Sequence, residues 1–142
     1  MSNRAPNWSR VRLHVVSGKG GTGKTTVAAA LALALARGGK KVLLLEVENR
    51  QGFAQLFDTA PLPYKETRIA VAEDGGVVYA LPIDAEAALL EYLEMFYGLK
   101  RGGYALRKLG AIAFATTIAP GLREVLLTGK ASEAAKRGAP TR

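Results

Sequence analysis

The sequence predicts an α/β fold built on a parallel sheet, and three observations support this. Val42-Leu43-Leu44-Leu45 is apolar at every position, as expected for a strand buried on both faces. A second apolar stretch, Val11–Val16, precedes it in the chain. Between them lies a run of alanine and leucine that strongly favours helix, so the three form one strand–helix–strand unit with a right-handed crossover. We therefore expect a parallel, doubly wound sheet with helices on both faces.

The first part of the chain is predicted to alternate strands and helices. Arg12 and His14 interrupt the first strand, and Gly38-Gly39 ends the first helix because glycine readily takes the left-handed turn after a helix. In order, the expected elements are a strand over Val11–Val16, a glycine-rich loop over Ser17–Gly23, a helix over Lys24–Arg37, a strand over Lys41–Val47, a polar loop over Glu48–Gly52 and a short helical turn over Phe53–Phe57.

The second part is predicted to contain a hairpin followed by helices. Asp74-Gly75-Gly76 suits a tight turn between strands over Thr67–Ala72 and Val77–Leu81. Asp84 is placed to cap a helix over Ala85–Tyr97. Two further helices are expected, over Tyr104–Thr117 and from Pro120 to about Lys130. The chain is thereby divided into a lead over residues 1–10, the main domain over 11–130 and a frayed basic tail over 131–142.

Composition excludes several classes of protein. The chain has 142 residues, of which 49% are hydrophobic, so it can bury a core without disulfides. It contains no cysteine, which excludes a disulfide framework and a cysteine-ligated zinc site within this sequence. No apolar run is as long as a membrane span, and Met1–Arg10 does not resemble a signal peptide. We expect a cytoplasmic protein.

The charge is unevenly distributed. Residues 1–45 hold 8 basic and no acidic residues, 46–97 hold 3 basic and 10 acidic, and 98–142 hold 9 basic and 2 acidic, giving a net charge of +8. Basic ends could suit nucleic acid or an acidic membrane surface. Nucleic acid is the less favoured partner because no aromatic residues interleave with the basic ones. The favoured interpretation is that part of the charge faces a polyphosphate ligand and the rest lies on the solvated surface.

One motif carries specific chemistry. Gly18-Lys19-Gly20-Gly21-Thr22-Gly23-Lys24-Thr25 fits the phosphate-loop pattern G-x-x-x-x-G-K-[ST] between a predicted strand and a predicted helix. Glycines let the loop amides converge on an anion, and the positive end of the helix dipole adds to them. Lys24 supplies charge for the β and γ phosphates, Thr25 is the expected Mg²⁺ ligand, and Thr26 can approach the α-phosphate. The predicted phosphate-binding residues are Gly18, Gly20, Gly21, Thr22, Gly23, Lys24, Thr25 and Thr26.

Two further features bear on the chemistry of the site: a second lysine in the loop and two glutamates after the second predicted strand. Lys19 places a second lysine in the loop, which is the mark of the "deviant Walker A" ATPases. Glu46 and Glu48 stand at the carboxyl end of the second predicted strand, the side that faces the ligand in doubly wound sheets. A carboxylate there could orient water, and position alone does not choose between the two.

Four segments together resemble the ArsA-like anion-transporting ATPases, which include arsenical-pump ATPases and targeting factors for tail-anchored membrane proteins. They are Lys19–Thr26, Glu46–Phe57, Ile83–Ala88 and Ala119–Leu126, and the likeness extends from about Val11 to Lys130. The resemblance implies a P-loop ATPase that binds ATP and Mg²⁺ and works as a homodimer or a paralogous heterodimer. Lys19 would then act on the partner's phosphates across a nucleotide sandwich. Glu48 stands where the family has an Asp that positions the hydrolytic water.

The sequence also departs from the family's pattern. The arsenite-binding and zinc-binding cysteines are missing, so arsenite is not the expected effector. The later strand that ends in Asp-x-x-Pro-x-Gly is missing too, so we expect an incomplete sheet, a truncated or frame-altered chain, marginal stability and poor hydrolysis by this chain alone.

Three alternatives stay open at this point. Apolar residues over Asp84–Tyr97 and Leu106–Ile118 could line a groove for a hydrophobic client or a membrane protein, although core or dimer packing is favoured. The protein could be a ParA-like or MinD-like partitioning or positioning ATPase that binds DNA or a membrane surface. It could also be a nucleotide-binding subunit that does not hydrolyse ATP.

Overall fold

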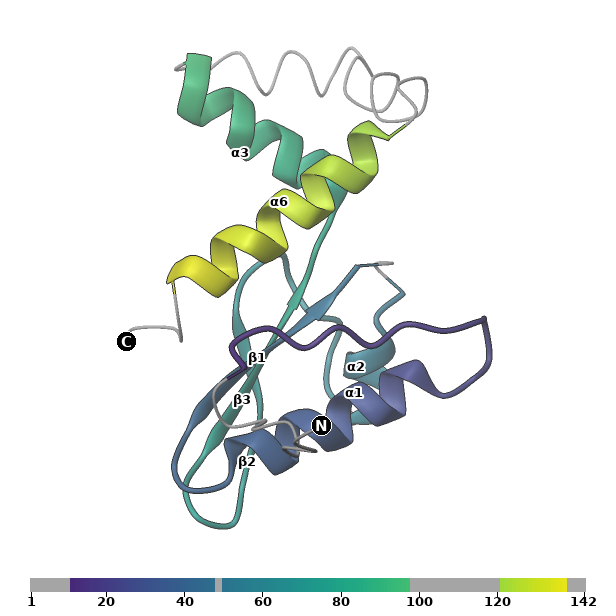
Figure 1. Cartoon of the computed structure of the whole chain (residues 1–142), viewed down its shortest axis with the longest axis vertical. Coiled ribbons are helices and arrows are strands. Elements are labelled where there is room, and N and C mark those ends of the chain that lie inside the picture. Colours follow the sequence, from purple (N-terminus) through teal and green to yellow (C-terminus); the bar gives the residue numbers. More distant parts are fainter. Residues whose placement is uncertain (1–10, 48–49, 98–120, 138–142) are drawn as a thin grey trace, which may run out of the picture.

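The computed structural model describes residues 11–47, 50–97 and 121–137 (Figure 1). Its elements are α1 (Lys24–Ala36), β1 (Lys41–Glu46), α2 (Gly52–Leu56), β2 (Thr67–Val71), β3 (Val77–Pro82), α3 (Ala85–Tyr97) and α6 (Leu122–Arg137). The helix predicted over Tyr104–Thr117 lies outside the described residues, as does Pro120.

The described strands form a three-stranded sheet in the order β1-β3-β2. β1 and β3 are parallel, with Lys41 paired to Val77 and Glu46 paired to Pro82. β2 is antiparallel to β3, and the two are joined by the predicted hairpin turn. The α/β class is therefore confirmed, with a mixed sheet in place of a purely parallel one.

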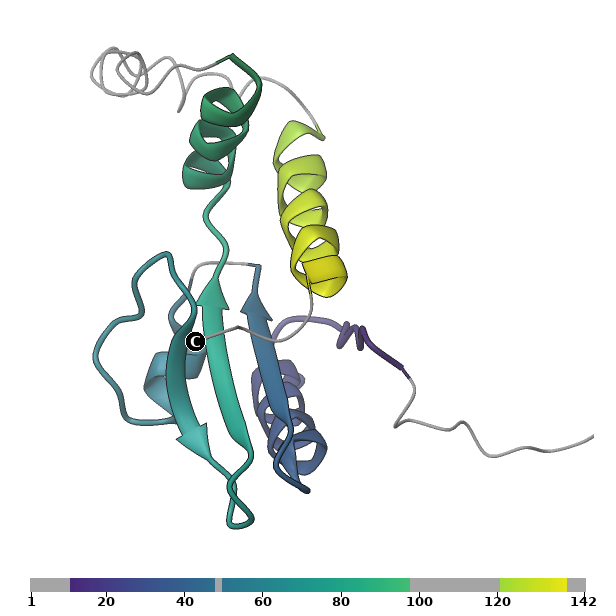
Figure 2. The ribbon, with the colours of Figure 1, turned by 90° about the vertical axis from the view of Figure 1, so that its left-hand side faces the viewer.

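Helices approach this sheet from two sides. α1 and α2 lie against one face, while α3 and α6 extend beyond the carboxyl ends of β1 and β3 (Figure 2). Leu127 of α6 packs with Ile83, and Leu45 lies against this pair. Because side chains alternate along a strand, Leu45 and its neighbour Leu44 point to opposite faces. α6 therefore meets the face opposite α1, at the carboxyl end of the sheet.

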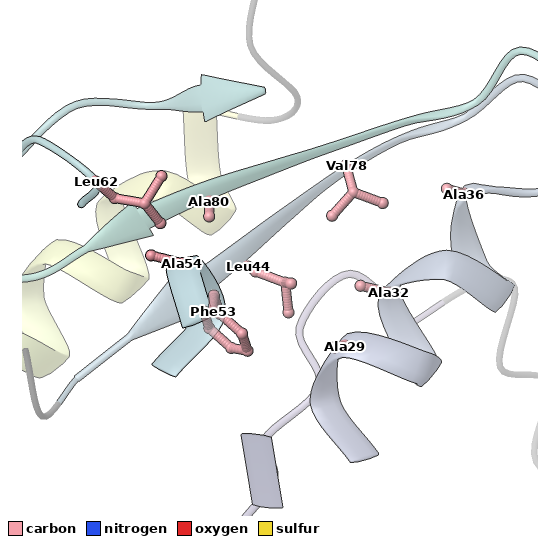
Figure 3. Close-up of a cluster of buried hydrophobic side chains, with 9 residues drawn as sticks. All are labelled: Ala29, Ala32, Ala36, Leu44, Phe53, Ala54, Leu62, Val78 and Ala80. Carbon is pink, nitrogen blue, oxygen red and sulfur yellow. The ribbon is translucent and has the colours of Figure 1, made fainter. Parts of the chain in front are cut away.

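The main core lies between the sheet, α1 and α2 (Figure 3). The buried residues that α1 contributes to this layer are all alanines, so its backbone can approach the strands closely. Figure 3 shows Phe53 beside Leu44, in the space between α1 and α2. The nine buried residues are Ala29, Ala32, Ala36, Leu44, Phe53, Ala54, Leu62, Val78 and Ala80.

The strand predicted over Val11–Val16 is wrong. The segment contains no strand and does not belong to the sheet. Val11 and Leu13 are each 48% exposed and Val15 is 81% exposed. Apolar character favours an extended backbone, but a strand also needs a neighbour that pairs with its amides and covers its side chains. None of the described strands does this for Val11–Val16.

The helix predicted to end near Lys130 is longer than expected, because α6 continues to Arg137. Leu127 and Ala134 are buried seven residues apart, on one face of the helix. Arg12 donates a hydrogen bond to the carbonyl of Ala135 at 2.7 Å, and Arg137 pairs with Glu66. Tertiary contacts thus stabilise residues that the sequence assigned to a frayed tail.

Other predicted boundaries agree with the structure. Gly38 and Gly39 have φ values of 77° and 75°, directly after α1. The amide of Ala87 donates to the Asp84 carboxylate at 2.8 Å, so Asp84 caps α3 as predicted. Among the described helices, none has the length and apolar character needed to cross a membrane.

Candidate functional site

The phosphate-loop motif forms a tight turn in front of α1. Gly21 and Gly23 both have a φ of 78°, a left-handed conformation that favours glycine. The carbonyl of Lys19 accepts hydrogen bonds from the Thr22 hydroxyl at 2.8 Å and from the Lys24 ammonium at 2.9 Å. The loop therefore curls around one carbonyl, and the Lys24 side chain folds back over it.

The amino end of α1 presents unpaired amides beside this loop. Its N-cap is Gly23, which has no side chain to cap the helix. The amide of Val27 donates to the Gly23 carbonyl at 3.0 Å, so the helical pattern provides no acceptor for the amides of Lys24, Thr25 and Thr26. Together with the helix dipole, these amides favour an anion at this end.

The space in front of the loop is open. A Cβ atom added at Gly20, Gly21 or Gly23 would meet no heavy atom within 4 Å. At Gly18, by contrast, a Cβ would lie 3.1 Å from the Thr22 hydroxyl and 3.7 Å from Lys24 Cγ. The loop is thus packed on its inner side at Gly18 and accessible from outside, as a phosphate group would require.

The magnesium ligand predicted from the motif lies beside an acidic side chain. A Cβ added at Gly52 would lie 3.0 Å from Glu46 Oε1 and 3.5 Å from the Thr25 hydroxyl. Glu46 Oε1 accepts a hydrogen bond from the Gly52 amide at 2.7 Å. Glu46 Oε2 is buried and has no hydrogen-bond partner among the described residues.

These residues fit a magnesium–phosphate group. In the described part of the chain, no three His, Cys, Asp or Glu side chains gather as a metal site. Mg²⁺ needs no such cluster, since it is commonly held by one or two protein oxygens together with phosphates and water. The Thr25 hydroxyl can serve as the protein ligand, and Glu46 Oε2 is a nearby carboxylate oxygen without a hydrogen-bond partner among the described residues.

Of the two remaining predicted site residues, the structure describes Lys19 but not Glu48. Lys19 is exposed, at the outer surface of the loop. Glu48 lies outside the described residues, so its predicted role in positioning water stays a prediction. The contact between Glu46 and Gly52 is not among the sequence predictions. A local signal for it is the glycine six residues after the glutamate.

Comparison with known proteins identifies the family. A model of the family described as "Anion-transporting ATPase" matches residues 11–137, which include the phosphate loop and every described element. The chain belongs to the anion-transporting ATPase family. The resemblance that the motifs predicted is therefore confirmed.

Relatives of this family member carry ATPase names. "ATPase BagA" of Mycobacterium tuberculosis is 69% identical over 129 residues, covering 91% of this chain and 38% of the relative. "Putative arsenical pump-driving ATPase 2" of Aquifex aeolicus is 30% identical over 120 residues, covering 82% of this chain and 38% of the relative. The chain thus spans 38% of the length of these curated relatives.

Proposed function

We propose that this chain forms the ATP-binding part of an ATPase. The observation that carries the proposal is the uncapped amino end of α1, with an open glycine loop and the folded-back Lys24 directly in front of it. A triphosphate would supply the acceptors that the α1 amides lack. Family membership supports the same conclusion.

Each residue of the loop has a distinct proposed task. The amides of residues 18–24 surround the β-phosphate, and the Lys24 ammonium exchanges its bond to the Lys19 carbonyl for phosphate oxygens. The Thr25 hydroxyl would hold magnesium, and Thr26 would approach the α-phosphate. When bound, magnesium neutralises phosphate charge as it develops.

We further propose that hydrolysis is coupled to the rearrangement of a dimer. Lys19 is exposed beside the nucleotide site, and none of its described contacts engages its ammonium, which leaves that group available to a partner's phosphates. Its action in trans would resemble that of an arginine finger. Glu48 would position the attacking water. In the whole protein this cycle would serve anion transport or the targeting of membrane proteins.

The nucleotide proposal is tested by measuring MgATP affinity with Lys24→Ala. Loss of a charge-assisted contact of about 1.5–3 kcal/mol should weaken binding about 10- to 100-fold. Lys40→Ala is the matched control, because it removes an equal charge from an exposed position beyond the other end of α1. Calorimetric titration of both variants would show the difference. Equal affinities for wild type and Lys24→Ala would contradict the proposal.

A further inference from the structure

Glu46 lies between three parts of the site: the end of β1, the beginning of α2 and Thr25. It is the last residue of β1, and its carbonyl accepts a hydrogen bond from the Ile83 amide at 2.7 Å. Its backbone is therefore held by the parallel neighbour strand. Two residues earlier on the same face of the strand, Leu44 lies in the main core. The Glu46 side chain thus starts from a rigid part of the fold.

The first carboxylate oxygen of Glu46 fixes the beginning of α2. Oε1 accepts the Gly52 amide at 2.7 Å. The next two residues, Phe53 and Ala54, are buried in the core that Leu44 and α1 share (Figure 3). Glu46 therefore ties the first residue of α2 to the end of β1.

The second oxygen has no such partner. Oε2 is buried and makes no hydrogen bond among the described residues, although a buried carboxylate oxygen normally has one. Gly52 allows Glu46 and Thr25 to approach each other, because a Cβ there would lie 3.0 Å from Glu46 Oε1 and 3.2 Å from Thr25 Cγ2. The unsatisfied acceptor thus belongs to a side chain that lies next to the proposed magnesium ligand.

We propose that Glu46 is a positioning residue of the magnesium–nucleotide site. Oε1 holds the Gly52 amide, and Oε2 accepts a hydrogen bond from the hydration shell of the magnesium ion that Thr25 binds. This inference rests on the proposed function. It assigns to Glu46 a role distinct from that of Glu48, since Glu46 stabilises the bound ion and does not contact the attacking water.

The test is the magnesium dependence of ATP affinity in Glu46→Gln. Glutamine can keep one oxygen on the Gly52 amide, but its NH₂ group cannot accept a hydrogen bond. ATP affinity in EDTA should be that of the wild type. The magnesium concentration that gives half of the affinity gain should rise about 10- to 100-fold, as for other residues that support a metal ligand. Glu73→Gln is the control, because it removes the same charge from the exposed hairpin turn.

The other possible outcomes would overturn either the proposal for Glu46 or the proposed function. Wild-type magnesium dependence in Glu46→Gln would overturn the proposal. An equal loss of affinity with and without magnesium, or loss of folding, would show that Glu46 only supports the chain and would overturn it too. A wild-type chain that binds no ATP in either condition would instead refute the proposed function itself.

Discussion

Gly76 shows how a single residue controls the approach of two elements. It is buried where the β2–β3 turn meets the end of α1. A Cβ at this position would lie 1.8 Å from the carbonyl oxygen of Ala36 and 3.1 Å from that of Lys40. Because both neighbours are backbone atoms, they cannot move aside as a side chain could. The hairpin can therefore reach α1 only with glycine here.

We predict that Gly76→Ala lowers the free energy of unfolding by about 1–3 kcal/mol, the usual cost of overpacking. Gly129→Ala is the control, since a Cβ at this exposed position of α6 would meet no heavy atom within 4 Å. It should raise stability by about 0.5–1 kcal/mol because alanine favours helix. Urea unfolding measures both changes. Equal effects of the two variants would contradict the packing argument.

At the scale of elements, polar contacts join segments that are far apart in sequence. Lys130 of α6 pairs with Glu91 of α3 at 2.7 Å and lies over the Tyr64 ring. Burial lowers the pKa of Lys130, but hydrogen bonds and charges from Glu91 and Glu133 outweigh it and raise the net value. Burial, followed by the Glu91 charge, also raises the pKa of Tyr64. Lys130 thus connects α6 with α3 and with Tyr64, which lies between α2 and β2.

A second polar contact joins the β2–β3 hairpin to the end of α1, and it predicts how stability depends on pH. The Gly38 amide donates to the Asp74 carboxylate, and this bond is the main reason that the pKa of Asp74 lies below its ordinary 3.8. Folding therefore favours the charged form. The stabilisation is present above about pH 4 and is lost as the pH falls through the folded-state pKa.

The expected result is that Asp74→Asn reduces the loss of stability on acidification from about pH 6 to about pH 3. Melting temperatures at intervals over this range provide the measurement. Asp58→Asn serves as the control, because Asp58 is exposed and its side chain makes no described hydrogen bond. An Asp74→Asn profile parallel to that of the wild type would show that the bond does not contribute.

At the scale of the whole molecule, the proposed dimer depends on Lys19. We predict that Lys19→Ala keeps MgATP affinity within about twofold but weakens nucleotide-dependent self-association about 10- to 100-fold, as expected for the loss of one charge-assisted contact. Sedimentation with and without MgATP would separate the two effects. A loss of ATP affinity equal to that of Lys24→Ala would make Lys19 a ligand of its own nucleotide and refute action in trans.

Local patterns predicted much of this fold correctly. The start of α1, its end before Gly38, the β2–β3 hairpin and the Asp84 cap all follow from contacts within a few residues. Backbone sterics and hydrogen bonds of nearest neighbours decide such features, so a sequence can reveal them. The phosphate-loop motif is likewise recognised from spacing along the chain, and the phosphate-binding role of its glycines and lysine stays a prediction.

Tertiary structure decided the rest. Val11–Val16 has the composition of a strand, but strand formation depends on partners elsewhere, and the structure pairs β1 with β3 instead. Contacts with residues far away in the sequence likewise extend α6 beyond Lys130. Position along the predicted strand did not separate Glu46 from Glu48, and the family resemblance favoured Glu48 for positioning water. Only the fold placed Glu46 against Gly52 beside Thr25, because the distance between side chains on different elements depends on how those elements pack.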